Sequence, residues 1–217
     1  MFEEYIKPLP NHLVQRYRGW KANNFSNSKA WYEKLANDGQ RPRAMIISCC
    51  DSRVNATSIF GADTGEFFIH RNIANLVPPF SKKLSHHGTS ATIEYAILAL
   101  KISNVVVLGH SNCGGASAAF DMFRNNNKKN HDSFFIHSWL SLMKPGYEKL
   151  SKETNDQFNK KELEKQSIIT SLQNLMTYPF IKDAVSDKNL NLHGLWFDIA
   201  VGNLESYDPN LKKFTDV

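Results

Sequence analysis

The sequence predicts an α/β fold with a mainly parallel central sheet flanked by helices, an N-terminal helical arm and a C-terminal strand hairpin. Short apolar runs typical of buried strands occur at residues 44–48, 66–70 and 105–109. Amphipathic helical patterns follow at residues 88–100 and 114–123. Strands that alternate with helices favour a parallel sheet. We therefore expect an arm over residues 1–37 and a single α/β domain over residues 38–217.

Outside this core pattern, the chain shows helices near both ends. Residues 12–37 have an amphipathic helical pattern, which residues 23–28 interrupt, so we expect two helices there. This segment precedes the first strand and is a candidate arm that packs on another subunit. A helix-like patch covers residues 135–143, and residues 162–176 form a strong amphipathic helix. Residues 195–200 are expected to form a strand, followed by a hairpin turn at Gly202 and Asn203.

Composition excludes several classes of protein. The 217 residues carry a formal net charge of +5, but Lys and Arg are scattered, so we expect a solvated basic surface and no nucleic-acid partner. No apolar run reaches the roughly 20 residues of a membrane helix. The first ten residues lack the basic start and apolar core of a secretory signal, so we expect a cytoplasmic location. Three cysteines, two of them adjacent, make a poor disulfide framework and leave metal ligands, reactive thiols or core residues as alternatives.

Three side chains of the types that commonly bind metals lie at the ends of predicted strands. Cys49 follows the first strand, and His110 and Cys113 form a His-x-x-Cys after the third apolar run. Sites in parallel sheets form where the carboxyl ends of strands meet. One imidazole and two thiolates suit zinc and leave a fourth position open, as in catalytic sites. The alternative is a buried, inert cysteine pair with a histidine bonded in a turn.

Asp51 and Arg53 follow Cys49 within the same segment. Arginine can hold a carboxylate through two parallel hydrogen bonds, and the held carboxylate can orient a nucleophile at the metal. The alternative is an ordinary surface ion pair, which contributes little to stability. Cys50 is expected to point away from Cys49 and to be structural.

Three ordered motifs resemble the β-carbonic anhydrase family. They are CCDSRV at 49–54, HRNIAN at 70–75 and GTSATIEYAILALKISNVVVLGHSNCGG at 88–115. Two later segments, SLQNLMTYPF at 171–180 and HGLWFDIAVGNL at 193–204, also look like the family. The resemblance covers roughly residues 40–204. It implies a carbonic anhydrase that converts carbon dioxide and water into bicarbonate and a proton, through a zinc-bound hydroxide.

The resemblance assigns roles to residues of this chain. It implies one zinc ion per chain, Zn²⁺, held by Cys49, His110 and Cys113, with Asp51 and Arg53 as the catalytic dyad. It also implies a substrate pocket that includes Gln40, Phe68, Ile73 and Tyr95. Some of these pocket residues reach the site from a second subunit in the family, so we expect a homodimer or a dimer of dimers. Read alone, the three apolar residues would be ordinary core.

One position departs from a pattern seen in some bacterial members of the family. A tryptophan stands three residues before the first zinc cysteine in those members, as part of a regulatory bicarbonate pocket, and here that position is Ile46. We therefore expect Asp51 to pair with Arg53 near neutral pH. Asp51 would become a zinc ligand only in a closed state. His86 and His87 are candidate proton relays, although two histidines in a polar loop are more often solvated.

Three other functions are compatible with parts of this pattern. The same architecture can hydrolyse carbon disulfide or carbonyl sulfide. A non-catalytic zinc module that binds a partner would use the same three ligands, but it would not need the Asp51–Arg53 pair. A thiol-redox protein is a further alternative, but the chain has no Cys-x-x-Cys.

Overall fold

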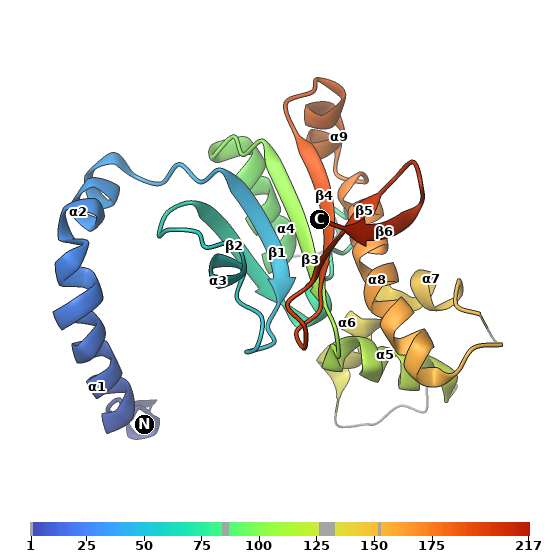
Figure 1. Ribbon diagram of the computed structural model, residues 1–217, viewed down its shortest axis with the longest axis horizontal. Helices are drawn as coiled ribbons and strands as arrows, with labels where there is room; N and C mark the ends of the chain where they lie inside the picture. The colour runs from blue at the N-terminus through green and yellow to red at the C-terminus, as the bar shows by residue number, and fades with distance from the viewer. Residues whose placement is uncertain (1, 84–86, 126–132, 152) are drawn as a thin grey trace. The chain divides into compact units, whose positions relative to one another are not determined.

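The structure is a computed structural model, which describes residues 2–83, 87–125, 133–151 and 153–217 (Figure 1). The chain divides into two compact units, Met1–Arg41 and Pro42–Val217. The described helices include none that is long and apolar enough to cross a membrane.

The first unit is mainly helical. It contains η1 (Phe2–Tyr5), α1 (Asn11–Trp20), the π-helical turn η2 (Lys21–Phe25) and α2 (Lys29–Asp38). The two expected helices are present, and the chain leaves helical geometry at Ser28, with φ −116° and ψ 19°. Side chains of Trp20, Phe25 and Tyr32 form an aromatic cluster with ring centroids 5.3–5.8 Å apart. No residue of α1 or α2 is buried, so the unit has no closed core of its own.

The second unit is built on a six-stranded sheet in the order β2-β1-β3-β4-β5-β6. Its strands are β1 (Ala44–Cys49), β2 (Phe67–Asn72), β3 (Asn104–His110), β4 (Asn191–Phe197), β5 (Leu204–Asp208) and β6 (Lys213–Asp216). The first four strands in this order run parallel, and β5 and β6 add antiparallel pairs. The predicted fold class, a mainly parallel sheet flanked by helices and ending in a hairpin, is confirmed.

The C-terminal strands differ in detail from the expectation. The strand expected at residues 195–200 begins earlier, at Asn191, and ends at Phe197. It ends there because the Asp198 side chain accepts a hydrogen bond from the Ala200 N–H, at 2.9 Å, which bends the chain into a turn. Gly202 adopts a positive φ of 72° in the connection between β4 and β5, as a hairpin turn requires. The last strand, β6, was not expected.

Helices cover the sheet and extend beyond its carboxyl edge. They are α3 (Ala56–Ile59), η3 (Ile73–Asn75), α4 (Gly88–Glu94) with the π-helical turn η4 (Tyr95–Ala99), α5 (Gly114–Arg124), α6 (Phe134–Leu140), η5 (Ser141–Met143), α7 (Lys144–Tyr147), α8 (Asp156–Leu175) and α9 (Pro179–Ser186). Helix α8 begins at Asp156, six residues before the expected start at residue 162. It begins there because the Asn155 side chain caps the helix by accepting a hydrogen bond from the Phe158 N–H at 2.9 Å. The sequence pattern did not predict α9, which begins with Pro179 in its first turn.

Both faces of the central strands carry apolar side chains. Met45, Ile47, Val105 and Val107 pack against α4, α8 and α9 in the largest core cluster. Ile46, Val106 and Leu108 lie on the opposite face in a smaller cluster. Burial on two faces explains why these strands have continuous apolar runs without polar alternation.

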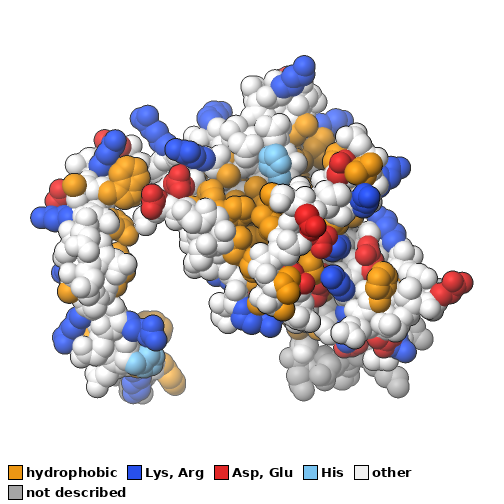
Figure 2. All heavy atoms as spheres, in the orientation of Figure 1, with side chains coloured by type: hydrophobic (Ala, Val, Ile, Leu, Met, Phe, Trp, Pro, Cys, Tyr) orange, Lys and Arg blue, Asp and Glu red, His pale blue; other side chains and the backbone are white. Residues whose placement is uncertain are grey.

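Part of the second face is open to solvent. A shallow hollow of about 310 Å³ lies there, and Figure 2 shows apolar side chains gathered over this side of the sheet. The hollow is lined by Ala44, Ile46, Phe60, Phe67, Asn104, Val106, His193 and Leu195. We call this the open sheet face.

Helix α8 approaches the sheet very closely. A Cβ added at Gly109 of β3 would lie 2.7 Å from Cδ1 of Ile168, and one at Gly194 of β4 would lie 2.9 Å from Cγ2 of the same residue. A larger residue at either position would force the Ile168 side chain or the helix to shift. The packing therefore sets α8 against Gly109, near the end of β3, and against the middle of β4.

Candidate metal centre

The ends of two neighbouring parallel strands create the centre. In the pairing of β1 with β3, Ser48 lies opposite Leu108, so Cys49 and His110 leave the sheet at the same edge. Asn112 then turns the chain with a positive φ of 54°. Cys113 follows as the residue that precedes α5. The His-x-x-Cys spacing thus brings the second thiol back over the strand ends.

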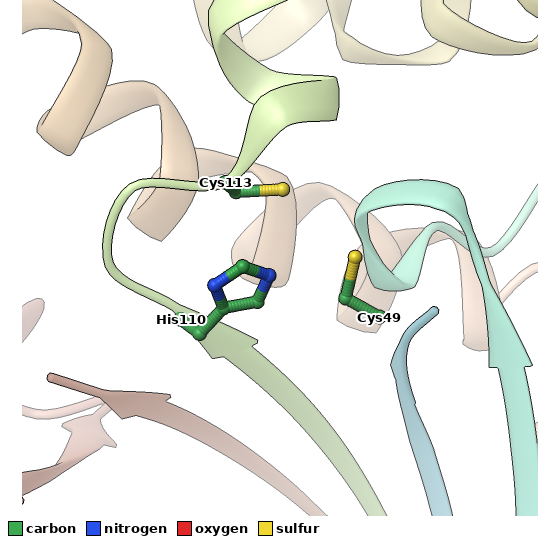
Figure 3. A group of neighbouring side chains, drawn as sticks. All are labelled: Cys49, His110 and Cys113. Atoms are coloured by element: carbon green, nitrogen blue, oxygen red, sulfur yellow. The ribbon is translucent and has the colours of Figure 1, made fainter. Parts of the chain in front are cut away.

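The three side chains point toward one point in space (Figure 3). The ligand atoms of Cys49, His110 and Cys113 all lie within 4.8 Å of one another. All three residues are buried, with exposed fractions of 5%, 0% and 3%. Among the described residues, this is the one group of three or more such side chains with metal-binding geometry. The predicted ligands are therefore brought together.

The histidine has the hydrogen bonding of a metal ligand. His110 Nδ1 lies 2.9 Å from the backbone carbonyl of Ser111, which accepts a hydrogen bond from the Nδ1–H tautomer. His110 Nε2 is buried and has no hydrogen-bond partner among the residues that the structure describes. A buried nitrogen without a partner is costly, and a metal ion would satisfy it. The set of two sulfurs and one imidazole nitrogen fits zinc.

The two thiols share a strongly perturbed environment. A hydrogen bond from Cys113 lowers the pKa of Cys49 to about 4, against the opposing effect of burial. The hydrogen bond to Cys49, followed by burial, raises the pKa of Cys113 above its usual range. The Ala74 N–H also donates to Cys49 Sγ at 3.4 Å. Without metal, the pair therefore favours one thiolate and one thiol, and metal binding would release the remaining proton.

Asp51 and Arg53 form a bidentate pair beside this cluster. Arg53 Nε donates to Asp51 Oδ1 at 2.9 Å, and Nη2 donates to Oδ2 at 2.7 Å. These hydrogen bonds hold the pKa of Asp51 well below its usual range. Asp51 Oδ2 lies 3.9 Å from His110 Nε2, so the carboxylate borders the space where the ligand atoms converge. Arg53 Nη2 also donates to the backbone carbonyl of Asn112, at 3.1 Å.

Two further residues support the site, and neither was predicted. Arg71 donates to the backbone carbonyls of Cys49, Asp51 and Val54 at 2.7–2.8 Å, which shapes the segment that carries the dyad. Glu164 of α8 accepts a hydrogen bond from the Cys113 N–H at 3.0 Å. Arg71 lies within the HRNIAN segment, which could have drawn attention to it. No local pattern marks Glu164, which resembles any polar residue of an amphipathic helix.

The residues predicted to line a substrate pocket lie in different settings. Phe68 and Tyr95 pack together with ring centroids 5.9 Å apart, and Tyr95 is half exposed. Ile73 is partly exposed and directly precedes Ala74, whose N–H contacts Cys49. Gln40 is exposed and belongs to the first unit. The role of all four in substrate binding stays a prediction.

Three other sequence expectations concern positions outside the ligand cluster. Cys50 is exposed, in contrast to the two buried cysteines. His87 caps α4 through its Nδ1, which lies 3.3 Å from the Ser90 N–H. His86 lies outside the described residues. Ile46 is buried in the sheet and lines the open sheet face.

Comparison with known proteins adds independent evidence. A sequence model of the carbonic anhydrase family matches residues 44–204. Beta carbonic anhydrase 3 of Arabidopsis thaliana is 32% identical over 196 residues, which cover 89% of this chain and 74% of that protein.

Solved structures with the same fold also carry this family name. The β-carbonic anhydrase CcaA matches with a TM-score of 0.82 and 28% identity, over 95% of this chain and 98% of that one. A tetrameric β-carbonic anhydrase from the ascomycete Sordaria macrospora matches with a TM-score of 0.76 and 29% identity, over 94% and 98%. With the family match spanning most of the sheet and all three ligands, the chain belongs to the β-carbonic anhydrase family.

Proposed function

We propose that this chain catalyses the reversible hydration of carbon dioxide to bicarbonate and a proton, with one zinc ion per chain. The observation that carries the proposal is the buried cluster of Cys49, His110 and Cys113 beside the Asp51–Arg53 pair. Three protein ligands leave one position of a tetrahedral metal open, as in catalytic sites. When bound, zinc supplies a Lewis acid that lowers the pKa of water toward neutrality.

Asp51 is the residue that would orient the nucleophile. Its lowered pKa keeps the carboxylate ionised at neutral pH, so it accepts hydrogen bonds and does not serve as a general acid. Its two bonds to Arg53 fix the direction of Oδ2 near His110 Nε2. Arg53 is itself tied to the carbonyl of Asn112, within the loop that joins two metal ligands. The dyad is therefore anchored to the same loop as the metal cluster.

Apolar side chains would hold carbon dioxide, some of them supplied by a second subunit, as the family resemblance implies. Phe68, Ile73 and Tyr95 are the proposed lining, and Gln40 is proposed as a further substrate-binding residue. The place of Ile73 beside Ala74, whose N–H contacts Cys49, supports the assignment of that residue. A cytoplasmic location remains a prediction from the sequence.

We also propose that the active form is a homodimer or a dimer of dimers. The open sheet face is apolar and partly exposed, and the first unit buries no residue in α1 or α2. A second copy of the chain would cover such surfaces, because large exposed apolar patches mark interaction sites. The Sordaria macrospora relatives are described as tetrameric. The division between an arm at residues 1–37 and a domain at residues 38–217 belongs to this proposal.

Substituting one ligand tests the metal centre. Cys113→Ser is expected to lose zinc and nearly all hydration activity, because a serine hydroxyl is a far weaker zinc ligand than a thiolate. Metal analysis and stopped-flow hydration on the same sample give the readout. Cys50→Ser is the matched control, since Cys50 is exposed and lies outside the cluster. Full zinc occupancy with wild-type hydration in Cys113→Ser would refute the ligand assignment.

Removing the charge of Asp51 tests the dyad. Asp51→Asn is expected to retain zinc but to lose about a hundredfold in the hydration rate, because the orienting group is misplaced. Asp121→Asn is the control, since that carboxylate pairs with Lys160 on the surface. If Asp51→Asn hydrates carbon dioxide as fast as the wild type, the dyad is only structural.

Parallel assays with carbon disulfide and carbonyl sulfide separate hydration from the alternative hydrolase activity.

The resting state of the centre is a separate prediction. Asp51 is expected to stay paired with Arg53 in the zinc-loaded protein near pH 7.5, because the guanidinium already satisfies both carboxylate oxygens. A crystal structure at that pH gives the answer. An Asp51 oxygen about 2.0–2.2 Å from zinc would contradict the prediction.

Assembly can be measured directly. Sedimentation at micromolar concentration is expected to give a dimer or a tetramer, because the open sheet face and the first unit present apolar surface. A stable monomer that retains full activity at this concentration would overturn the prediction.

A further inference from the structure

Helix α8 carries a row of polar side chains on its buried face. Glu164, Ser167, Ser171 and Asn174 follow one another at intervals of three or four residues, so they share one side of the helix. Each contacts a segment that follows a strand. Ser167 Oγ lies 3.4 Å from Asn75 Nδ2, Ser171 Oγ accepts from the Val77 N–H at 3.1 Å, and Asn174 Nδ2 donates to the Val77 carbonyl at 2.8 Å.

Glu164 differs from the others because it contacts a metal ligand. Its Oε1 accepts a hydrogen bond from the Cys113 N–H at 3.0 Å, and its Oε2 accepts one from the Trp196 indole N–H at 3.2 Å. Glu164 is only 5% exposed. Within the described parts of the chain, no ion pair to this carboxylate is present. Burying such a group is costly unless its hydrogen bonds are satisfied, and the two N–H groups satisfy one bond at each oxygen.

Cys113 is the ligand that most needs external support. Cys49 and His110 end strands whose positions the sheet ladder sets. Cys113 instead lies after a turn, at the residue that precedes α5, and its side chain makes no cap hydrogen bond to that helix. The bond to Glu164 restrains the backbone of Cys113, and therefore the direction of its thiolate.

Trp196 fixes the other end of the bridge. Its side chain is 1% exposed, so the indole cannot shift without disturbing the core. Lys161 and Lys165 each place an ammonium nitrogen 4.7 Å from the centre of its ring. The carboxylate of Glu164 thus connects Trp196, a rigid core residue, to Cys113, the one proposed ligand that lies in a loop.

We propose that Glu164 is a positioning residue for the metal centre, which holds Cys113 in ligand geometry by bridging its amide to the indole of Trp196. This inference rests on the proposed zinc site. Partners of metal ligands in other proteins typically change metal affinity 10–100-fold when they are lost. The same range is expected here. Ser167, Ser171 and Asn174 hold residues 75–77 and do not contact the ligands.

The test compares two substitutions on the same face of α8. Glu164→Gln keeps one acceptor oxygen, but its amide NH₂ faces one of the two N–H donors and cannot accept a hydrogen bond from it. It is expected to weaken zinc binding about 10–100-fold in chelator competition. In the cobalt-substituted protein, the thiolate-to-cobalt absorption is expected to shift, because the geometry at Cys113 changes. Ser171→Ala removes hydrogen bonds of similar kind and is expected to leave both readouts unchanged.

Two outcomes of this comparison would overturn the inference. One is a folded Glu164→Gln protein with the zinc affinity and cobalt spectrum of the wild type. The other is an equal loss of zinc affinity in Ser171→Ala, since the effect would then belong to the helix in general. A wild-type chain that binds no zinc would instead contradict the proposed function.

A measurement on the unsubstituted chain covers the case in which Glu164→Gln does not fold. Amide hydrogen exchange of Cys113 in the metal-free wild-type protein is expected to be slow, because its N–H is buried and bonded to Glu164. Exchange at the rate of an unprotected amide would show that the bridge is absent, and it would overturn the inference without involving zinc.

Discussion

The parallel pairing of β1 with β3 is the constraint on which the rest of the site depends. Ser48 lies opposite Leu108, so Cys49 and His110 leave the sheet at one edge and on adjacent strands. A slip of one residue in this register would turn every side chain of the shifted strand to the opposite face. The burial of Ile47 and Val107 on one face, and of Ile46 and Val106 on the other, opposes such a slip. The core thus sets the position of the metal ligands.

Helix α8 connects the sheet to the segments that follow β2 and β3. Its close approach at Gly109 anchors it one residue before His110, and its polar row reaches residues 75–77 and Cys113. Arg53 joins the segment after β1 to the loop after β3. The centre is therefore held by two separate parts of the chain, helix α8 and the bidentate Asp51–Arg53 ion pair. Such restraint matters because catalysis at a metal requires fixed directions as well as fixed ligands.

The sequence predicts those parts of the fold and of the site whose causes lie in neighbouring residues. The runs at residues 44–48 and 105–109 predicted β1 and β3, because strands buried on two faces must be apolar throughout. The ligand residues followed from their types and their places at strand ends. The end of β4 was missed because the Asp198 side chain turns the chain within an apolar stretch. The role of Glu164 was missed because it depends on a contact with Cys113, far away in the sequence, which only the packing of α8 creates.

We propose that this fold places a zinc ligand set beside an orienting carboxylate, and that the two together hydrate carbon dioxide. Stopped-flow hydration on samples of graded zinc content tests it most directly. We expect the hydration rate to rise in proportion to bound zinc and to saturate near one ion per chain. A fully zinc-loaded protein that hydrates carbon dioxide no faster than the metal-free chain would contradict it.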